Sequence, residues 1–220
     1  MFNWRNSKRI VLVAATVLLS CQQNSPTKPE AVEPERVNSI RRYVYADADG
    51  KRVIIYNSVP KGGGFTDSTG RRLPYTVFYT QVINGTGEPI NLNIDFPLDS
   101  QEVPASSGNF LKLMLPSDEM TLDKVPLYDY GLDVQTIFNG KRPAAATLNR
   151  TIAPNDSMAF YVLTSSNRGV DGALRTGFSL KGQQLVYKVA VFKSAPGHLL
   201  AGEREINAGS ISSSDLTLQK

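Results

Sequence analysis

Apolar and polar residues alternate strictly in the segment INLNIDF, residues 90–96. Its apolar members, Ile90, Leu92, Ile94 and Phe96, fall on one face of an extended chain, and its polar members fall on the other. A period of two is typical of a β-strand that covers one side of a hydrophobic core. The pattern therefore favours a sheet protein over a helical one.

Similar segments recur along the chain between clusters of turn residues. They are RYVYAD (42–47), RVIIYN (52–57), YTVFYTQVI (75–83), NFLKLML (109–115), ATLNRTI (146–152), SMAFYVLTS (157–165), ALRTGFSL (173–180) and QLVYKVAVF (184–192). Asp49-Gly50 suits a hairpin between the first two, and the last two can pair across KGQ. Such recurrence predicts an all-β protein, an antiparallel β-sandwich.

Two segments break the strand pattern, so the expected sandwich carries one or two short helical turns. PSDEMTLDK, residues 116–124, can hold a turn capped by Ser117, and LDVQTIFNG, residues 132–140, can form a short helix that ends at Asn139-Gly140. The glycine-rich residues 60–72 predict a mobile loop.

The end of the chain, GSISSSDLTLQK, predicts either a frayed tail or an edge strand. TIAPNDSMAFYVL, residues 151–163, resembles a sequence pattern common in immunoglobulin-like domains of the cell envelope: a strand, a turn with proline and polar residues, and a second strand with aromatic residues facing inward. The resemblance covers about a dozen residues and implies an immunoglobulin-like sandwich, but no function.

The first twenty residues have the three parts of a secretory signal peptide. Arg5, Lys8 and Arg9 form a positive head, residues 10–19 are almost entirely apolar, and a small residue precedes Cys21. The apolar run is shorter than the roughly 20 residues that a stable membrane span needs. We therefore expect residues 1–20 to be removed.

LLSC, residues 18–21, resembles the lipobox of bacterial lipoproteins. The resemblance implies cleavage before Cys21, a diacylglycerol on its thiol, and a fatty acid such as palmitate on the new amino terminus. Gln22, where an Asp would resemble the inner-membrane retention signal, favours the outer membrane. The alternatives are an ordinary signal peptide with an incidental cysteine, or a buried core thiol.

Residues 22–39 contain three prolines and no apolar periodicity, so they predict a flexible tether. The expected organisation is a signal peptide over 1–20, a lipidated amino terminus and tether over 21–39, and a single β-sandwich domain over 40–220.

Charge argues against nucleic acid as a partner. The chain has 24 basic and 20 acidic residues, and loss of the leader removes three basic ones. No run of Lys and Arg remains to follow a phosphate backbone. Cys21 is the only cysteine, so we expect no disulfide.

No motif predicts catalysis, a metal site or a cofactor. The chain has one histidine, His198, and no G-x-S-x-G elbow, and a zinc site is not expected with one His and no free Cys. Paired carboxylates of the glycosidase type remain open, because such enzymes need only two acids. The available acids are Asp95, Asp99, Glu102, Asp118, Glu119, Asp129 and Asp133.

Tyrosines give the best indication of a binding site. Those at i, i+2 or i, i+4 spacing are Tyr43, Tyr45, Tyr75, Tyr79, Tyr128 and Tyr130. On a strand each pair would share a face, as cross-strand packing or as an aromatic platform for a sugar or peptide. Tyr128 and Tyr130, in PLYDYG, lie between elements, where binding residues tend to collect.

The sequence thus predicts a lipid-anchored protein of the cell envelope, periplasmic or surface-facing, that acts as a non-enzymatic binding or structural module. The expected partners are the membrane, through the lipid, and a glycan, a peptide or another envelope protein. The alternative is a carboxylate-based hydrolase of envelope or host glycans.

Overall fold

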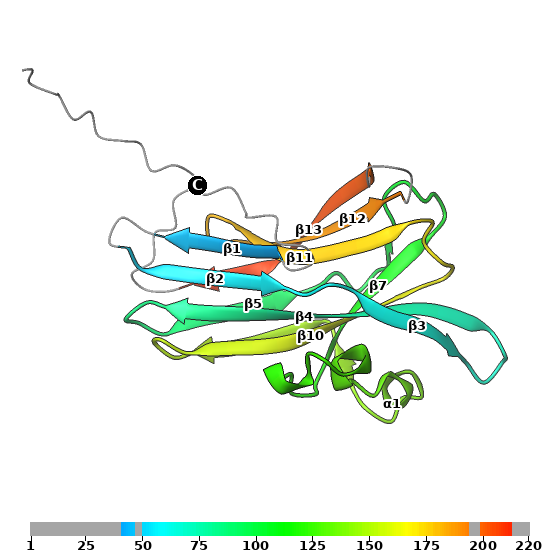
Figure 1. The fold of residues 1–220 in the computed structure, drawn as a ribbon, viewed down its shortest axis with the longest axis horizontal. Helices are drawn as coiled ribbons and strands as arrows, with labels where there is room; N and C mark the ends of the chain where they lie inside the picture. The colour runs from blue at the N-terminus through cyan, green and yellow to red at the C-terminus, as the bar shows by residue number, and fades with distance from the viewer. Residues whose placement is uncertain (1–40, 47–49, 194–198, 213–220) are drawn as a thin grey trace, which may run out of the picture. The chain divides into compact units, whose positions relative to one another are not determined.

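The computed structural model describes residues 41–46, 50–193 and 199–212 of the chain (Figure 1). Its strands form two antiparallel sheets. The first has the order β1-β2-β4-β10-β7-β6, with β3 also pairing β4 and β8 pairing β7, and the second has the order β11-β12-β13-β5-β9. In Figure 1 β11, β12 and β13 of the second sheet lie toward the top, and the helical turns lie at the bottom, below β10.

The strands predicted from the sequence lie at nearly the predicted residues, and β3, β6, β8 and most of β13 were not predicted. The strands are β1 (Arg41–Ala46), β2 (Arg52–Asn57), β3 (Lys61–Thr66), β4 (Arg72–Gly85), β5 (Ile90–Asp95), β6 (Gln101–Glu102), β7 (Phe110–Pro116), β8 (Ala144–Ala145), β9 (Thr147–Ile152), β10 (Ser157–Ser166), β11 (Ala173–Lys181), β12 (Gln184–Phe192) and β13 (Leu200–Ser212). The expected all-β sandwich with short helical turns is confirmed.

Two hairpins form as their turn residues predict. β1 pairs β2 with Ala46 opposite Arg52, and β11 pairs β12 with Lys181 opposite Gln184. Gly50 has a φ of 77°, as a tight turn requires, although residues 47–49 lie outside the described part of the chain.

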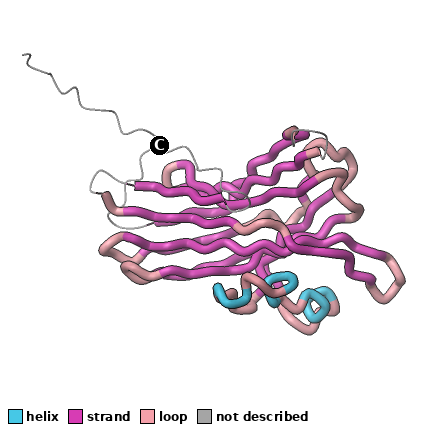
Figure 2. Tube along the Cα trace, viewed as in Figure 1, coloured by secondary structure: helices cyan, strands magenta, loops and turns pink. Residues whose placement is uncertain are grey.

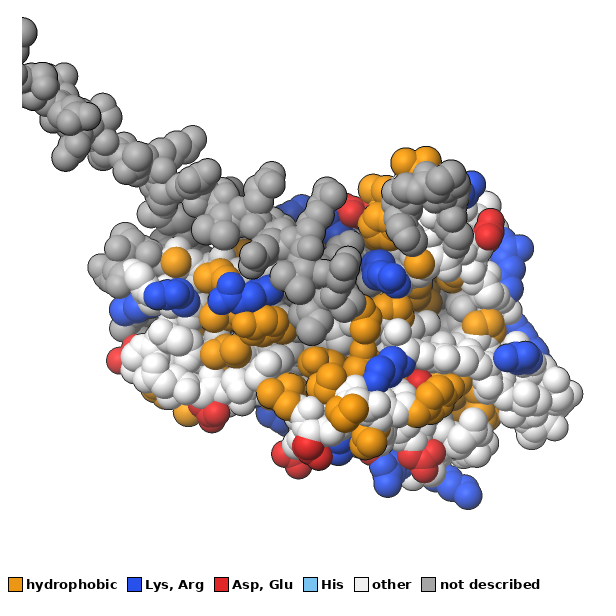
Figure 3. All heavy atoms as spheres, in the orientation of Figure 1, with side chains coloured by type: hydrophobic (Ala, Val, Ile, Leu, Met, Phe, Trp, Pro, Cys, Tyr) orange, Lys and Arg blue, Asp and Glu red, His pale blue; other side chains and the backbone are white. Residues whose placement is uncertain are grey.

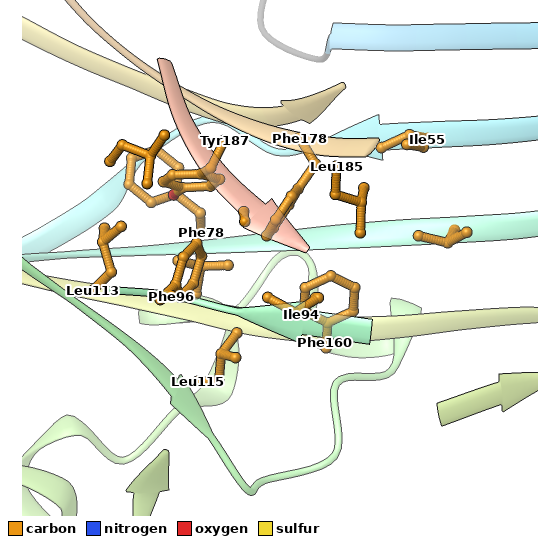
Figure 4. Close-up of a cluster of buried hydrophobic side chains, with 14 of the residues drawn as sticks. Ile55, Phe78, Ile94, Phe96, Leu113, Leu115, Phe160, Phe178, Leu185 and Tyr187 are labelled. Carbon is orange, nitrogen blue, oxygen red and sulfur yellow. The ribbon is translucent and has the colours of Figure 1, made fainter. Parts of the chain in front are cut away.

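The core between the sheets is built from the alternating apolar positions. Ile90, Leu92 and Ile94 of β5 are at most 1% exposed, and their neighbours point to solvent. Aromatic rings fill the middle: Phe178 lies 5.7 Å from Phe96 and 4.8 Å from Tyr187 between ring centroids (Figure 4). These offset and edge contacts are the arrangements that aromatic pairs prefer.

The middle of the first sheet, at β4 and β10, is buried on both faces. A second hydrophobic cluster lies on its outer face, against residues 117–143, here called the cover segment. Val77 and Tyr161 of the sheet meet Tyr130, Val134 and other apolar residues of the cover segment in this cluster. The protein therefore has a third layer, made of short helices and loops on one side of the sandwich (Figure 2).

The cover segment contains η1 (Leu122–Lys124), η2 (Tyr128–Gly131) and α1 (Val134–Phe138). The cap predicted at Ser117 is wrong, because Thr121 precedes η1 and the Ser117 hydroxyl donates to the carbonyl of Pro143 instead. The short helix near residue 134 is confirmed: the Asp133 side chain accepts from the Thr136 amide, and Gly140 follows with a φ of 70°.

Two further expectations are wrong for the residues that the structure describes. Residues 60–72 are not simply a loop, since residues 61–66 form β3 and pair with the start of β4. The carboxyl-terminal stretch is not an edge strand over its described part, because Gly209–Ser212 of β13 pair with β5, within the second sheet. Residues 213–220 lie outside the described part of the chain.

The side chain of Asn57 joins the two sheets. The Asn57 amide of β2 donates to the Phe178 carbonyl of β11 over 2.9 Å, and its oxygen accepts from the Phe178 amide over 2.8 Å. It thus imitates a strand backbone at the free edge of β11. Gly177 allows this approach, because a Cβ there would lie 2.7 Å from the Asn57 side chain.

We predict that Asn57→Ala destabilises the protein by about 2–4 kcal/mol, because it leaves a buried amide and a buried carbonyl of Phe178 without partners. The free energy of unfolding in urea measures this. Asn93→Ala, at an exposed position of β5, is the control and should change it by less than about 0.5 kcal/mol. Equal effects of the two substitutions would contradict the bridging role of Asn57.

Candidate functional site

The backbone of η2 is strained. Asp129, Tyr130 and Gly131 have φ values of 48°, 56° and 72°, so three consecutive residues adopt the left-handed conformation. Only glycine does so without steric cost, and a non-glycine residue held there costs about 1–3 kcal/mol. Such strain persists only where surrounding contacts hold it, and it concentrates at functional sites.

Asp129 makes the first of these contacts. The residue is 2% exposed, and its Oδ2 accepts a hydrogen bond of 2.6 Å from the hydroxyl of Tyr75 in β4. Its Oδ1 is buried and has no hydrogen-bond partner among the described residues. Burial raises the pKa of Asp129 above the usual range, against the lowering effects of the Tyr75 hydroxyl and the charge of Lys61.

Tyr130 makes the second set of contacts. It is 1% exposed, and its hydroxyl donates to the Val59 carbonyl over 2.6 Å. Its own carbonyl accepts from the hydroxyl of Tyr161 in β10 over 2.7 Å. Its ring meets Tyr79 edge to face, with centroids 5.0 Å apart. Burial raises the pKa of the Tyr130 hydroxyl, which therefore stays protonated as a donor.

Lys61 ties the start of β3 to the same turn. Its Nζ donates to the carbonyls of Val125 and Leu127 over 2.6 and 2.7 Å. The same Nζ lies 4.1 Å from the centre of the Tyr130 ring, within the range of a cation–π contact. η2 is thus fixed to β3, β4 and β10 together.

Tyr128 is the residue that this frame presents to solvent. It is 73% exposed, and Leu127 beside it is 50% exposed. Its hydroxyl lies over β3, since a Cβ at Gly63 would come within 3.1 Å of it and within 3.4 Å of the Tyr75 hydroxyl. Figure 3 shows hydrophobic side chains gathered on this face over the region where Figure 1 has the helical turns.

The structure separates the two tyrosines named from the sequence: Tyr128 lies on the surface, and Tyr130 lies beneath it. Tyr75 and Tyr79 are buried against the cover segment as well. Tyr43 and Tyr45 stack with centroids 6.4 Å apart and are half-buried against the main core. The tyrosine pairs therefore pack within the fold, and Tyr128 alone of these six is mostly exposed.

Three of the acidic candidates have partners other than a second carboxylate. Asp118 pairs with Arg142, and Asp133 caps α1. Asp129 has no carboxylate among its hydrogen-bond partners in the described part of the chain. Among the residues that the structure describes, no group of three or more His, Cys, Asp and Glu is placed to hold a metal ion. His198 and Cys21 lie outside the described residues.

A pocket that the sequence did not predict adjoins the other face of β3. It has a volume of about 300 Å³ and lies where β3 and β4 face the ends of β10 and β11. Gly62, Thr164, Ser166 and Arg175 are among its lining residues. The one sequence signal for this pocket is the small size of the side chains on the inner faces of these strands, such as Thr76, Thr164 and Ser166.

Comparison with known proteins identifies no relative: no protein-family model, no curated protein and no solved structure matches this chain. Within the described residues, no helix combines the length and apolar character needed to cross a membrane.

We predict that Asp129→Asn stabilises the protein at neutral pH. Because burial raises the pKa of Asp129 in the folded state, the free energy of unfolding falls as pH rises through that pKa. Asparagine keeps an acceptor for the Tyr75 hydroxyl, tolerates a left-handed φ and carries no charge. Urea unfolding should show the variant above the wild type at pH 7 and level with it below about pH 4, where the acid is protonated.

Asp99→Asn, at an exposed position, is the control and should change the free energy of unfolding at pH 7 by less than about 0.5 kcal/mol. A variant that is less stable than the wild type at pH 7 would show that the charged form of Asp129 holds the turn.

Proposed function

We propose that this protein is a lipid-anchored lipoprotein of the cell envelope and acts as a non-enzymatic binding module. Its contact surface is centred on Tyr128 and Leu127 of the cover segment. The leader, the LLSC segment and the tether-like composition of residues 22–39 support the anchored location.

The observation that carries the binding function is the exposed Tyr128 beside a strained, braced turn. An aromatic side chain that is already fixed loses little conformational entropy on binding, and for this reason rigid tyrosines are frequent anchors in interfaces. Hydrogen bonds from Lys61 and Tyr161 hold the backbone carbonyls on either side of Tyr128, at Leu127 and Tyr130. The Tyr75 hydroxyl holds the side chain of the next residue, Asp129.

The chemistry of this surface suits a glycan, a peptide segment or another envelope protein. The Tyr128 ring offers an apolar face, Leu127 extends it, and the tyrosine hydroxyl can donate or accept a hydrogen bond. Leu122, 53% exposed, lies on the same cover segment.

We predict that Tyr128→Ala reduces capture of the native partner at least about tenfold, as expected for loss of an aromatic anchor. The measurement is quantitative co-purification of the full-length protein from membranes of its native host. Leu98→Ala is the matched control, because Leu98 is a large apolar residue that is 85% exposed in the β5–β6 connection. A partner list that is the same for both variants would remove this surface as the site.

Anchorage is tested at Cys21. We predict that Cys21→Ser abolishes acylation and moves the protein from the membrane to the soluble fraction. Intact mass spectrometry of the wild type should show a chain that begins at Cys21 and carries fatty acyl groups. A chain that retains Met1, or a thiol without lipid, would contradict the anchor and leave the Tyr128 surface as a separate question.

A further inference from the structure

β3 is an edge strand with an open side. It pairs with β4 from Lys61 opposite Val77 to Thr66 opposite Arg72, and no other described strand pairs with it. β2 continues along the same side of β4, where β1 covers its outer edge. β1 pairs with the outer edge of β2, but no described strand pairs with the outer edge of β3.

The ladder shows which backbone groups of β3 point outward. The Ser58 amide donates to the Tyr79 carbonyl over 3.0 Å, so odd-numbered residues of β4 direct their backbone groups toward β2 and β3. This alternation places Pro74, which has no amide hydrogen to donate, on the opposite side of β4. The partners Lys61, Gly63 and Phe65 then bond to β4, and Gly62, Gly64 and Thr66 point away from it.

The side chains of β3 do little to block this edge. Three consecutive glycines form its centre, and Gly62 and Gly63 are exposed. Natural edge strands are usually protected by charged residues, proline, bulges or a covering segment, because unpaired backbone groups accept an added strand. Within β3 the only charged side chain is Lys61, which is turned to the cover segment.

The surroundings of the edge are positively charged. Arg71 and Arg72 are exposed, and the Arg72 guanidinium lies over Gly64, where a Cβ would come within 2.2 Å of its Nε. Arg175 lines the adjoining pocket together with Gly62. The one acid of the β3–β4 hairpin, Asp67, accepts hydrogen bonds from Thr69 and Arg71 within its own turn.

We propose that β3 binds an extended, acidic segment of a partner protein as an added strand, through the outward backbone groups of Gly62, Gly64 and Thr66. This inference rests on the proposed binding function and names its partner class. Backbone hydrogen bonds supply affinity in strand addition, and alternate side chains supply specificity. On the outer face of the added strand these side chains reach toward Tyr128, whose hydroxyl lies over Gly63.

Charge selects this occupant over a second copy of the chain. Pairing two copies about the centre of β3 would bring the Arg72 guanidinium of one, which lies over Gly64, close to the Arg72 guanidinium of the other, and like charges oppose that contact. An acidic strand meets the same side chain as an ion-pair partner.

The test is NMR of the full chain without its leader, with an acetylated and amidated octapeptide of alternating glutamate and valine as the probe. We expect the amides of Gly62, Gly64 and Thr66 to shift and gain protection from hydrogen exchange, and the exchange rates of Lys61, Gly63 and Phe65 to stay as they are. Only an added strand produces this alternation. An octapeptide of alternating lysine and valine should bind at least about tenfold more weakly.

Two pairs of variants sharpen the test. Thr66→Pro removes one outward amide and should weaken binding about tenfold, whereas Thr66→Ala keeps the amide and should bind like the wild type. Arg71→Glu with Arg72→Glu should weaken binding at least as much. Arg150→Glu, an exposed arginine on the edge strand β9 of the other sheet, should have no effect.

Each other outcome overturns the inference in its own way. Shifts around Tyr128 without protection of the glycine amides would place the peptide on the aromatic surface, which leaves the proposed function standing. Protection of Gly62, Gly64 and Thr66 before the peptide is added would show that the chain itself occupies the edge. Concentration-dependent protection would indicate a second copy, and equal binding of the lysine peptide would refute the acidic partner.

Discussion

Val77 and Phe78 are adjacent in β4, and both are buried, on opposite faces of one sheet. β10 repeats the arrangement with Tyr161 and Val162. A sandwich of two sheets buries only one face of each, so these strands require a further layer on the outside. The cover segment provides it. Its shape, its anchoring and the residue that it leaves exposed all follow from the need to cover the outer face of β4 and β10.

Tyrosine side chains make up much of the contact between the cover segment and the outer face of the sheet. Each ring supplies apolar area, and each buried hydroxyl must find a partner. Tyr130 and Tyr161 find theirs in carbonyls at or near the cover segment, and Tyr75 finds its partner in Asp129. Two non-glycine residues in the left-handed conformation cost together about 2–6 kcal/mol. Several hydrogen bonds of about 1 kcal/mol each, with the burial of Tyr130, offset a cost of that size.

The sequence predicted elements wherever side-chain patterns determine them. Strands with β-branched and aromatic residues, such as β5, β10 and β12, were found almost to the residue, and so was α1 with its Asn139-Gly140 end. β3 was missed because Gly62, Gly63 and Gly64 have no side chain that could carry a period of two, so its pairing is decided by β4. Tyr128 and Tyr130 were both predicted as binding residues because PLYDYG lies between elements. In η2 the left-handed backbone turns one outward and the other inward, and no local pattern in the sequence encodes that turn.

The glycines of β3 leave its backbone open to a binding partner and also open to aggregation. Without Cβ atoms they let the hydroxyl of Tyr128 rest over one face of the strand and Arg72 over the other, so the edge lies between an aromatic ring and a guanidinium. The same absence of side chains exposes a backbone that could template aggregation. The positive charge lies beside the strand and not on it. It repels an identical edge, which opposes aggregation, and it attracts a strand of opposite charge to the backbone groups of β3. Selectivity at this edge thus depends on Arg71 and Arg72 of β4 and its turn, while β3 itself supplies only hydrogen bonds.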